Sequence, residues 1–432
     1  WETVCEQVAI DQISVYAGSA MGQLDNAGAG GMMKARYQGQ RVTSKYCPLS
    51  LAEMPADFIN AYVLGSLGST GATLGACASF LYNLRNGIQD IISGRARVAF
   101  VGSAEAPVNP EVMEGYAAMG ALATDKGLRG LDGLGDDQDP DHRRACRPFS
   151  DNCGFTIAES SQMAVLFDDE LAMQLGATMY GAATDVFVNA DGHKKSISGP
   201  GVGNYITMAK AVAAARSIVG EEGVRRGGLV QAHGTGTPQN RTSESEILSR
   251  TAEAFGIQDW PVAAIKCYLG HSLGSASGDQ FNATLGIWSH GIIPGIDTIE
   301  QLAEDVHRDR LDFALRHRAL ESEEQQYAII NSKGFGGNNA SATLLSPSVT
   351  ARMLQARYSD QEWTAWQRAN EDVQARQQAY DDDMVLGTRE PVYKFDHGVL
   401  LDGDVELGAG RMLVGGKVVD LDFESPYPDM QI

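Results

Sequence analysis

A run of apolar residues that ends in a glycine-rich loop recurs in both halves of the chain, and this pattern constrains the fold most strongly. In the first half, residues 13–21 predict a strand entering such a loop, and residues 97–106 predict a second buried strand. In the second half, residues 228–238 and 261–274 repeat the transition, after a strongly helical segment at 208–220. The alternation is typical of a layered α/β protein, and its repetition suggests an internal duplication.

The segment that begins at Cys77 has the period of an amphipathic helix. Its apolar positions share one face, and Gly94 ends the pattern. The residues on this face are Phe80, Leu81, Leu84, Ile88 and Ile91. We therefore expect a helix directly after Cys77, followed by the buried strand at 97–106.

The character of the chain changes after residue 346. Residues 351–380 are rich in Gln and Arg and predict one exposed helix. Its sparse apolar positions are Leu354, Trp363, Trp366 and Val373. From Pro391 onward, short β-prone runs alternate with Gly and Asp-Gly turns, which predicts two or three β-hairpins. Earlier in the chain, the Gly- and Asp-rich residues 128–147 predict a solvated surface insertion.

Composition and charge limit the functions open to the chain. Its 55 acidic and 34 basic residues give a net charge of −21, which argues against non-specific nucleic-acid binding because such binding needs surface cations. No apolar run approaches the roughly 18 residues of a membrane helix, and the first residues lack the pattern of a secretory signal. We expect a soluble, cytoplasmic protein with no nucleic-acid or membrane partner, although residues can precede Trp1.

The six cysteines are scattered, with no Cys-X-X-Cys pair, so the sequence predicts neither a zinc site nor a disulfide framework. Nothing in the sequence indicates a metal, nucleotide or flavin cofactor. One cysteine, Cys77, stands in GATLGACAS between a predicted strand and a predicted helix.

A thiol at such a junction lies in the positive field of the helix N-terminus and beside free backbone N–H groups. This placement would lower the pKa of Cys77 and supply donors for an oxyanion. A buried structural cysteine is the alternative. The small residues around Cys77 leave room for a substrate to approach the backbone, which favours the chemical role.

Two of the eight histidines lie in glycine-rich loops at predicted strand ends. His233 stands in QAHGTGTP, and His271 stands in KCYLGHSLG with Lys266 five residues before it. A lone histidine at a strand end is commonly structural, but loops of this kind could fix each ring and leave it neutral.

A fourth glycine-rich segment, residues 331–339 (NSKGFGGNN), follows a predicted strand at 327–330. It predicts a loop that is either a plain glycine turn or a mobile gate whose amides face a ligand.

Together, and in this order, these motifs are specific. With Cys77, His233, Lys266 with His271, and the GFGG turn, the chain resembles the β-ketoacyl-acyl-carrier-protein synthases, which are condensing enzymes of the thiolase fold. The resemblance runs from about residue 12 to about residue 346 and includes residues 102–124 and the tripeptide RPF at 147–149. More narrowly, the chain is similar to the initiating synthases of pseudomonads and their relatives, which are longer than the standard enzymes.

The resemblance implies an α/β fold of five layers, αβαβα, built from duplicated halves. We then expect residues 1–168 to form the half with the nucleophile, residues 169–346 the half with the two histidines, and residues 347–432 a C-terminal extension of a helix and β-hairpins. Standard chains of the family carry a βαβα segment ahead of the point where this one begins, so the first half is expected to be incomplete. A homodimer without a cofactor is also implied.

The resemblance implies a role for each site residue. Cys77 would take an acyl group from a thioester, with the amides of Cys77 and Phe335 as an oxyanion hole and Phe335 as a gate. A malonyl thioester would lose CO2 while His233 and His271 hold the enolate oxygen, and Lys266 would orient and polarise His271. The carbanion would attack the acyl group in a step of fatty acid biosynthesis, with acetyl-CoA as one candidate primer.

Related activities on the same fold fit less well. Two histidines, rather than His and Asn, separate the chain from the synthase III class. A thiolase needs a second cysteine in a late CxG motif, and no cysteine follows Cys267. Chain-length-factor homologues typically lack the nucleophile, which is present here as Cys77. A non-catalytic scaffold or regulatory homologue stays open, supported by the changes near Lys266 and by the appended module.

Several positions depart from the family pattern. Arg241 replaces an Asp expected soon after HGTxTP, although Glu244 fits a later acidic position. Gln280 stands nine residues after His271 where the family has an acid, with Asp279 beside it. Lys333 occupies a position where Phe often precedes GFGG. These changes bear on chain length and primer choice more than on the condensation itself.

Residues 26–52 contain four cations and no Asp or Glu, within a strongly acidic chain. The cations are Lys34, Arg36, Arg41 and Lys45. Because acyl carrier proteins are acidic, this stretch is a candidate docking patch for the carrier. An exposed basic loop with no partner is the alternative.

Overall fold

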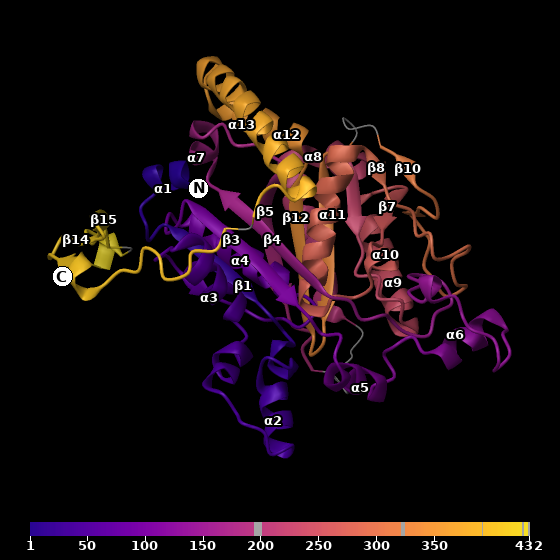
Figure 1. Cartoon of the computed structure of the whole chain (residues 1–432). Coiled ribbons are helices and arrows are strands. Elements are labelled where there is room, and N and C mark those ends of the chain that lie inside the picture. Colours follow the sequence, from indigo (N-terminus) through magenta and orange to yellow (C-terminus); the bar gives the residue numbers. More distant parts are fainter. Residues whose placement is uncertain (194–200, 321–324, 391, 426, 431–432) are drawn as a thin grey trace.

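Two β-sheets with helices between them and on both outer faces organise the protein (Figure 1). The computed structural model describes residues 1–193, 201–320, 325–390, 392–425 and 427–430. This arrangement gives the five layers that the family resemblance implies.

The first sheet has the strand order β2-β1-β3-β4. Its strands are β1 (Ile13–Gly18), β2 (Thr70–Gly71), β3 (Val98–Glu105) and β4 (Ser160–Phe167). Strand β1 is parallel to β2 and β3, whereas β4 runs antiparallel to β3. The side chains of β1 alternate, so that Ile13 and Val15 enter the cores of the outer face while Tyr16 packs toward the central helices.

The second sheet has the order β5-β12-β11-β6-β7-β9. Its strands are β5 (Ala182–Asn189), β6 (Gly228–Gln231), β7 (Trp260–Ala263), β9 (Leu311–Phe313), β11 (Tyr327–Gly334) and β12 (Asn338–Leu345). The pairs β11–β6, β6–β7 and β7–β9 are parallel, while β12 is antiparallel to both β11 and β5.

The two sheets repeat one topology. In the order β2-β1-β3-β4 the pairings are parallel, parallel and antiparallel, and the order β7-β6-β11-β12 has the same sequence of pairings. In each half a long central helix follows the first strand of that series, α4 after β2 and α11 after β7. The duplication suspected from the sequence is therefore visible as a repeated arrangement of strands and helices.

The central layer consists of α4 (Ser79–Ile92) and α11 (Ala276–His290), which pack between the sheets. The predicted apolar face of α4 is confirmed, because Phe80, Leu81 and Leu84 are buried in this core and Ile88 and Ile91 pack with them. Helix α4 ends where the sequence predicts, with Gly94 in a left-handed conformation directly after it.

Further helices cover the outer faces. On the second sheet, α8 (Val202–Arg226) and α9 (Pro238–Phe255) close the largest hydrophobic core. On the first sheet, α1 (Glu2–Gln7), α3 (Met54–Ile59) and α7 (Asp169–Gln174) cover two smaller cores. No helix within the described residues has the length and apolar character needed to span a membrane.

The remaining elements are short or belong to the C-terminal region. They are α2 (Ala29–Tyr37), α5 (Pro110–Ala118), α6 (Asp125–Asp132), α10 (Lys266–Leu269), α12 (Pro347–Arg357), α13 (Asp360–Leu386), β8 (Ile292–Ile293), β10 (Arg318–Ala319), β13 (Val405–Leu407), β14 (Arg411–Val414) and β15 (Lys417–Asp420). Helix α6 lies at the start of the predicted surface insertion, and the residues that follow it, 133–139, are mostly exposed.

The C-terminal region contains two helices where the sequence predicts one. Helix α12 ends at Arg357, and α13 begins after Ser359, whose side chain and that of Glu362 form a capping box. Helix α13 is anchored on the body through Trp366, whose indole N–H donates to the Ala177 carbonyl at 3.1 Å.

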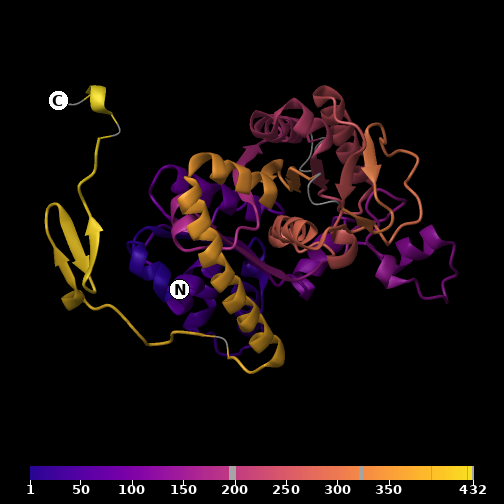
Figure 2. The same cartoon turned by 90° about the horizontal axis from the view of Figure 1, so that it is seen from above.

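Beyond α13 an extended segment leads to a small sheet at the margin of the body (Figure 2), where Lys417 of β15 donates to the Cys5 carbonyl of α1 at 3.3 Å. The sheet has the order β13-β14-β15 with antiparallel pairing, so the predicted hairpins are present, although residues 392–401 form no strand. Few contacts hold the segment. The Phe395 ring stacks on Tyr62 at 6.0 Å, and the Lys394 N–H donates to the Tyr62 carbonyl at 2.7 Å.

Two local predictions are wrong. Residues 331–339 are not a loop, because β11 continues to Gly334 and β12 starts at Asn338, which leaves a three-residue turn. The predicted loop after β7 contains the single helical turn α10, and Lys266 is its first residue.

Candidate active site

Cys77 lies at the junction of β2 and α4, as the sequence predicts. The preceding residue, Ala76, has a φ of 50°, which is uncommon outside glycine, so the chain turns sharply just before the cysteine. The Ser332 hydroxyl on β11 donates to the Cys77 carbonyl oxygen at 3.0 Å, and the cysteine is 4% exposed. The candidate nucleophile is therefore held by elements of both halves.

Strand β11 approaches this turn closely because Gly334 has no side chain. A Cβ atom on Gly334 would lie 2.1 Å from the Gly75 carbonyl oxygen, far inside van der Waals contact. Glycine is therefore required where the second half meets the cysteine turn. Directly after it, the backbone N–H of Phe335 is within hydrogen-bonding reach of the Cys77 sulfur.

Burial raises the pKa of the Cys77 thiol to about 11, and it is the largest influence on that group. The charge of Lys266 and the backbone N–H groups of Phe335 and Cys77 lower the pKa, while Glu105 adds to the increase. The predicted lowering of this pKa is therefore wrong in its net sign, because desolvation outweighs the nearby donors. Cys77 is a protonated thiol at neutral pH.

His233 lies in the loop after β6, and a buried carboxylate fixes that loop. Glu244 of α9 accepts the backbone N–H of His233 at 2.6 Å and that of Gly234 at 2.9 Å. The side-chain amide of Asn331 on β11 donates to the same carboxylate at 2.7 Å. Gly234 and Gly236 have φ values of 49° and 76°, which explains the glycines of the motif.

His271 follows α10 and is fixed by backbone hydrogen bonds to the first half. Its N–H donates to the Thr156 carbonyl at 2.7 Å, and its own carbonyl accepts the N–H of Ala158 at 3.1 Å. The Phe155 ring packs against the imidazole with a centroid separation of 5.0 Å. The rings of His233 and His271 lie 5.4 Å apart at an interplanar angle of 87°. The two predicted histidines therefore meet at one place.

Both imidazoles are neutral at pH 7. Burial lowers the pKa of His233 and of His271 well below the ordinary value, and the charge of Lys266 lowers both pKa values further. The Nδ1 atoms of both rings and the Nζ of Lys266 are buried and make no hydrogen bond with any residue that the structure describes. Because buried polar atoms without partners are costly, these three atoms are an unusual feature of the interior at this place.

Lys266 links the site electrostatically. It is 1% exposed, and burial lowers the pKa of its amine, while Glu244 and Asp279 act in the opposite direction. Its charge acts on Cys77 and on both histidines. No hydrogen bond joins Lys266 to the ring of His271 among the described residues, so its influence there is that of charge.

Aromatic side chains form one wall of the site. Phe335, at the β11–β12 turn, lies 5.9 Å from the ring of Tyr116 on α5, and Tyr116 lies 5.6 Å from Phe155. With Val112 and Leu273 these residues make a small core of their own. Sequence reasoning missed Tyr116, although it lies in the segment 102–124 that carries part of the family resemblance.

The acid near Lys266 comes from a position that the family pattern does not predict. The Gln280 amide donates to the backbone carbonyls of Gln231, Ala232 and Asn331, so it ties α11 to β6 and β11. Its neighbour Asp279 accepts the Ser160 hydroxyl at 2.6 Å and raises the pKa of Lys266. Gln280 is therefore a structural tie, and Asp279 supplies the negative charge.

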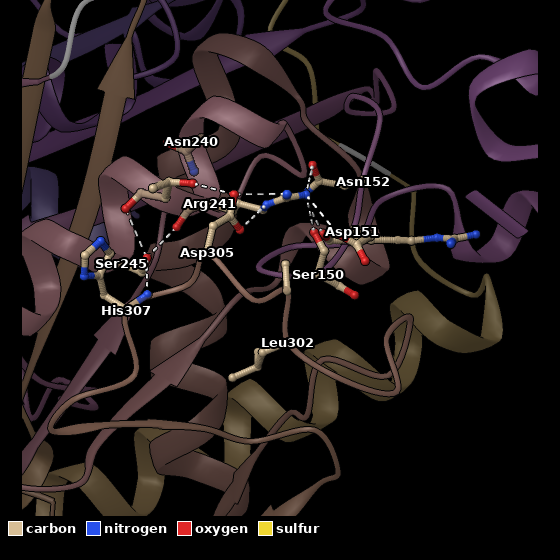
Figure 3. A network of polar contacts seen from close by, with 12 residues as sticks. Ser150, Asp151, Asn152, Asn240, Arg241, Ser245, Leu302, Asp305 and His307 are labelled. Atoms are coloured by element: carbon tan, nitrogen blue, oxygen red, sulfur yellow. Dashed lines mark hydrogen bonds and ion pairs between the residues drawn. The ribbon is translucent and has the colours of Figure 1, made fainter. Parts of the chain in front are cut away.

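Two other departures introduce cations. The amine of Lys333 on β11 donates to the Ser243 hydroxyl at 3.0 Å, and its charge lowers the pKa of His233. Arg241 on α9 forms a fork with Asp305, with N···O distances of 2.8 and 3.1 Å, and also contacts Ser150 (Figure 3).

The candidate docking cations lie apart from this cluster. Lys34 and Arg36 are on α2, which projects from the body (Figure 1), and Arg41 and Lys45 follow it. All four side chains are exposed, and none of them forms an ion pair with an acidic side chain among the described residues. No group of three or more His, Cys, Asp or Glu side chains within the described ranges is arranged to hold a metal ion.

Comparison with protein families gives two matches. The model of the β-ketoacyl synthase N-terminal domain matches residues 3–172, and that of the β-ketoacyl synthase C-terminal domain matches residues 180–299.

Comparison with curated proteins gives relatives of the same kind. The β-ketoacyl-[acyl-carrier-protein] synthase FabY of Pseudomonas aeruginosa is 52% identical over 416 residues, which cover 96% of this chain and 65% of the relative. The chain therefore spans slightly less than two thirds of that protein. A 3-oxoacyl-[acyl-carrier-protein] synthase 2 of Vibrio cholerae is 27% identical over 332 residues, which cover 76% of this chain and 75% of the relative.

Solved structures agree. The crystal structure of the ketosynthase FabY from P. aeruginosa superposes with a TM-score of 0.97 at 50% identity, covering 100% of this chain and 67% of that one. A type II polyketide ketosynthase in complex with its acyl-carrier protein, AntDE:AntF, gives a TM-score of 0.64 at 18% identity, covering 79% of this chain and 80% of that one. The second match supports the fold alone.

Proposed function

Because the chain belongs to the β-ketoacyl synthase family, we propose that it is a β-ketoacyl-acyl-carrier-protein synthase of fatty acid biosynthesis. It condenses an acyl thioester with malonyl-acyl-carrier protein and releases CO2. The observation that carries this proposal is the pair of buried imidazoles with ring centroids 5.4 Å apart, together with the buried Lys266, whose charge acts on both rings and on Cys77.

In the first step, the sulfur of Cys77 attacks the carbonyl carbon of the acyl thioester. The thiol proton leaves with the departing thiol, and the acyl group becomes bonded to Cys77. With a pKa of about 11, the free thiolate amounts to only about one part in ten thousand at pH 7. The charge of Lys266 favours that thiolate, and the amides of Cys77 and Phe335 stabilise the oxyanion.

In the second step, the bound malonyl thioester loses CO2, and the electron pair of the broken bond forms an enolate. The developing negative charge on the thioester oxygen accepts hydrogen bonds from the neutral rings of His233 and His271. Support comes from the separation of 5.4 Å between the two ring centroids, which lets both rings approach one oxygen atom. Neutral rings suit this role because they donate a hydrogen bond without protonating the carbanion.

In the third step, the enolate carbon attacks the acyl carbonyl on Cys77. A carbon–carbon bond forms, the carbon–sulfur bond breaks, and the thiolate takes a proton from solvent. The product is a β-ketoacyl thioester that is two carbons longer. Phe335 gates the acyl pocket, a role supported by its place on a turn with Gly336 and Gly337 at φ values of 85° and 83°.

The acyl carrier protein docks on the basic patch of residues 26–52. Support comes from the exposure of Lys34, Arg36, Arg41 and Lys45 and from the need to overcome repulsion between two acidic proteins. Reversing Lys34 and Arg36 to Glu raises KM for carrier-linked substrate and leaves KM for a small thioester mimic unchanged. An unchanged carrier KM would remove the patch from the proposal.

The protein acts as a homodimer, with residues 1–168, 169–346 and 347–432 as its three units. Strand β2 lies at an edge of the first sheet, where backbone groups are available to a second copy of the chain. Sedimentation equilibrium tests the dimer, and a monomer at micromolar concentration would contradict it.

Release of CO2 from malonyl-acyl-carrier protein, together with formation of β-ketoacyl product, tests the proposed reaction. Wild-type protein is supplied with acetyl-CoA or with longer acyl primers and compared with Cys77→Ala, Lys266→Ala and the control Cys5→Ala, a cysteine on α1. We expect Cys77→Ala to abolish product, Lys266→Ala to slow it, and Cys5→Ala to match wild type. Full product formation by Cys77→Ala, or none by wild type with any primer, would favour the scaffold alternative.

Labelling of Cys77 with a thiol reagent must take account of the more accessible Cys47. Cys47 is exposed, whereas Cys77 is buried with a raised pKa, so a small alkylating agent reaches Cys47 first. A Cys47→Ala background removes that thiol, and peptide mass spectrometry then reads Cys77 separately from the partly exposed Cys5 and Cys153. Loss of labelling at Cys77 when an acyl thioester is added in advance indicates acylation of that sulfur.

A further inference from the structure

Arg241 joins three segments of the protein (Figure 3). From the first turn of α9, its guanidinium donates to both carboxylate oxygens of Asp305 at 2.8 and 3.1 Å. The remaining nitrogen donates to the Ser150 carbonyl at 3.1 Å and lies 3.6 Å from the carboxylate of Asp151. The side chain of Arg241 is only 15% exposed, so these contacts are shielded in part from water.

Arg241 contacts the segment of residues 146–158, which we call the connecting segment. This segment contacts both histidine loops. Toward His233, the N–H of Gly154 donates to the Gly236 carbonyl at 3.2 Å. Toward His271, Thr156 and Ala158 exchange backbone hydrogen bonds with the histidine itself, and Phe155 packs on its ring. The place of each imidazole therefore depends on where the connecting segment lies.

The connecting segment carries backbone strain beside the point that Arg241 holds. Phe149 has a φ of 62°, a conformation that is a true outlier for a bulky residue, and its side chain is fully buried. Such a conformation persists only where the surroundings impose it. Two contacts do so here, since Ala303 donates to the Phe149 carbonyl at 3.0 Å and Arg241 holds the carbonyl of Ser150, the next residue.

The same turn of α9 also reaches His233 from the other side. Asn240, the neighbour of Arg241, donates to the carboxylate of Glu244 at 2.9 Å, and Glu244 accepts the backbone N–H of His233. A shift of this turn would therefore move the support of His233 and release the connecting segment at the same time.

We propose that Arg241 is a positioning residue for both histidines. Its fork to Asp305 and its contacts with Ser150 and Asp151 hold the connecting segment against α9, which sets the separation of the two imidazole rings. The inference rests on the proposed condensation, in which that separation decides how well the enolate oxygen is held. Lysine cannot replace arginine fully, because it lacks the planar fork that engages a carboxylate and a carbonyl together.

The test compares Arg241→Met and Arg241→Lys with a matched control, Arg97→Met. Arg97 forms a similar fork with Asp168, at 2.7 and 3.0 Å, and its side chain makes no hydrogen bond or ion pair with the connecting segment among the described residues. We expect Arg241→Met to lower kcat for condensation roughly 10- to 100-fold, with Arg241→Lys between it and wild type. The alkylation rate of Cys77, in a Cys47→Ala background, stays at the wild-type value. Arg97→Met loses comparable thermal stability and keeps kcat.

Amide hydrogen exchange gives a readout that does not depend on the reaction. Arg241→Met raises the exchange rates of residues 150–158 and of the loop at 233–237 severalfold, whereas Arg97→Met does not. A folded Arg241→Met variant with the wild-type kcat and wild-type exchange rates would overturn the proposal. So would a variant in which kcat, the alkylation rate of Cys77 and the folded fraction all fall together, because that would indicate a general loss of structure. If wild type makes no condensation product, the proposed function fails by itself, and the exchange rates still decide whether Arg241 holds the connecting segment.

Discussion

The two halves of the protein repeat one arrangement of strands yet carry different chemistry. In the first half, Glu105 accepts the backbone N–H groups of Ala20 and Met21 in the loop after β1. In the second half, Glu244 accepts those of His233 and Gly234 in the loop after β6. Each half thus uses a buried carboxylate to fix the corresponding loop, and only the loop after β6 carries a candidate catalytic side chain, His233. The buried carboxylate therefore holds the loop in both halves, and the halves differ in the side chain that the loop carries.

The halves also differ in charge at the site. The first half contributes Cys77 and the nearby carboxylate of Glu105, which raises the pKa of the thiol. The second half contributes the cations Lys266 and Lys333, which lower the pKa of His233, and Lys266 also acts on Cys77. The thiol of one half is therefore assisted by the lysine of the other, so the site is complete only where the halves meet.

The largest expected effects are those on the two partial reactions, acyl transfer to Cys77 and decarboxylation of the malonyl thioester, which we assign to different halves. Cys77→Ala abolishes acyl transfer to the protein, whereas His233→Ala and His271→Ala still accept a radiolabelled acyl group on Cys77. Each histidine variant lowers malonyl decarboxylation by about 100-fold or more, because one donor to the enolate oxygen is lost. Acyl labelling and CO2 release are measured on the same preparations. Histidine variants that lose both reactions while folded would show that the chemistry is not divided in this way.

Acid should act on the halves in opposite directions. His233 and His271 have lowered pKa values, so the unfolded chain binds their protons first and stability falls as pH drops below about 6.5, by about 1–2 kcal/mol for each ring at pH 5. Burial raises the pKa of Glu105, so that group adds stability as pH falls through its folded value. Urea unfolding between pH 7 and pH 5 measures the sum. A His233→Gln, His271→Gln double variant should lack the loss, and a wild-type curve without slope would contradict the assignment.

The two buried carboxylates should differ in cost when they are neutralised. In Glu244→Gln the amide NH2 group faces a backbone N–H that the carboxylate accepted, and a negative charge near Lys266 is lost. We expect this change to lower the free energy of unfolding by about 2–4 kcal/mol. Glu105→Gln should cost about 1–2 kcal/mol, because burial already favours the uncharged form of Glu105. Urea denaturation at pH 7 gives both values, and the reverse order would mean that the first half depends more on its carboxylate.

The smallest effect concerns the lysines of the second half. Because Lys333 lowers the pKa of His233, Lys333→Met should raise that pKa and move the acid limb of the pH–rate profile upward. Lys266→Met should move the limb further, since Lys266 has the larger influence and acts on both histidines. Arg97→Met serves as the neutralisation control. Coincident acid limbs for all four proteins would show that these charges do not set the protonation of the rings.

The site was largely predictable from the sequence because its residues stand where strands end in glycine-rich loops. Such loops mark places where backbone segments approach closely, and Gly234, Gly236 and Gly334 do so here. Cys77, His233, His271 and Lys266 were predicted on this basis together with the family resemblance. Tyr116 and Glu105 were not, because nothing local distinguishes a tyrosine or an acid that faces the site from one that faces solvent, whereas Asp279 was noted only as the neighbour of Gln280.

Two of the failed predictions share one cause, which is that tertiary packing outweighs local preference. The pKa of Cys77 rises because the folded chain buries the thiol, an effect that no sequence window contains. Residues 331–334 form a strand despite low β-propensity, because β12 pairs with them and the sheet supplies their hydrogen bonds. The break between α12 and α13 was also missed, but here the sequence does contain a signal, because Ser359 and Glu362 have the spacing of a capping box.

The contact between Gly334 and Gly75 makes the seam between the halves intolerant of any atom larger than hydrogen. The two halves, produced as separate polypeptides, would each keep a sheet and a central helix, but neither would have an oxyanion hole with a nucleophile in it. Activity recovered from a mixture of such fragments would therefore measure whether the backbones at Gly334 and Gly75 return to their original separation to within a few tenths of an ångström.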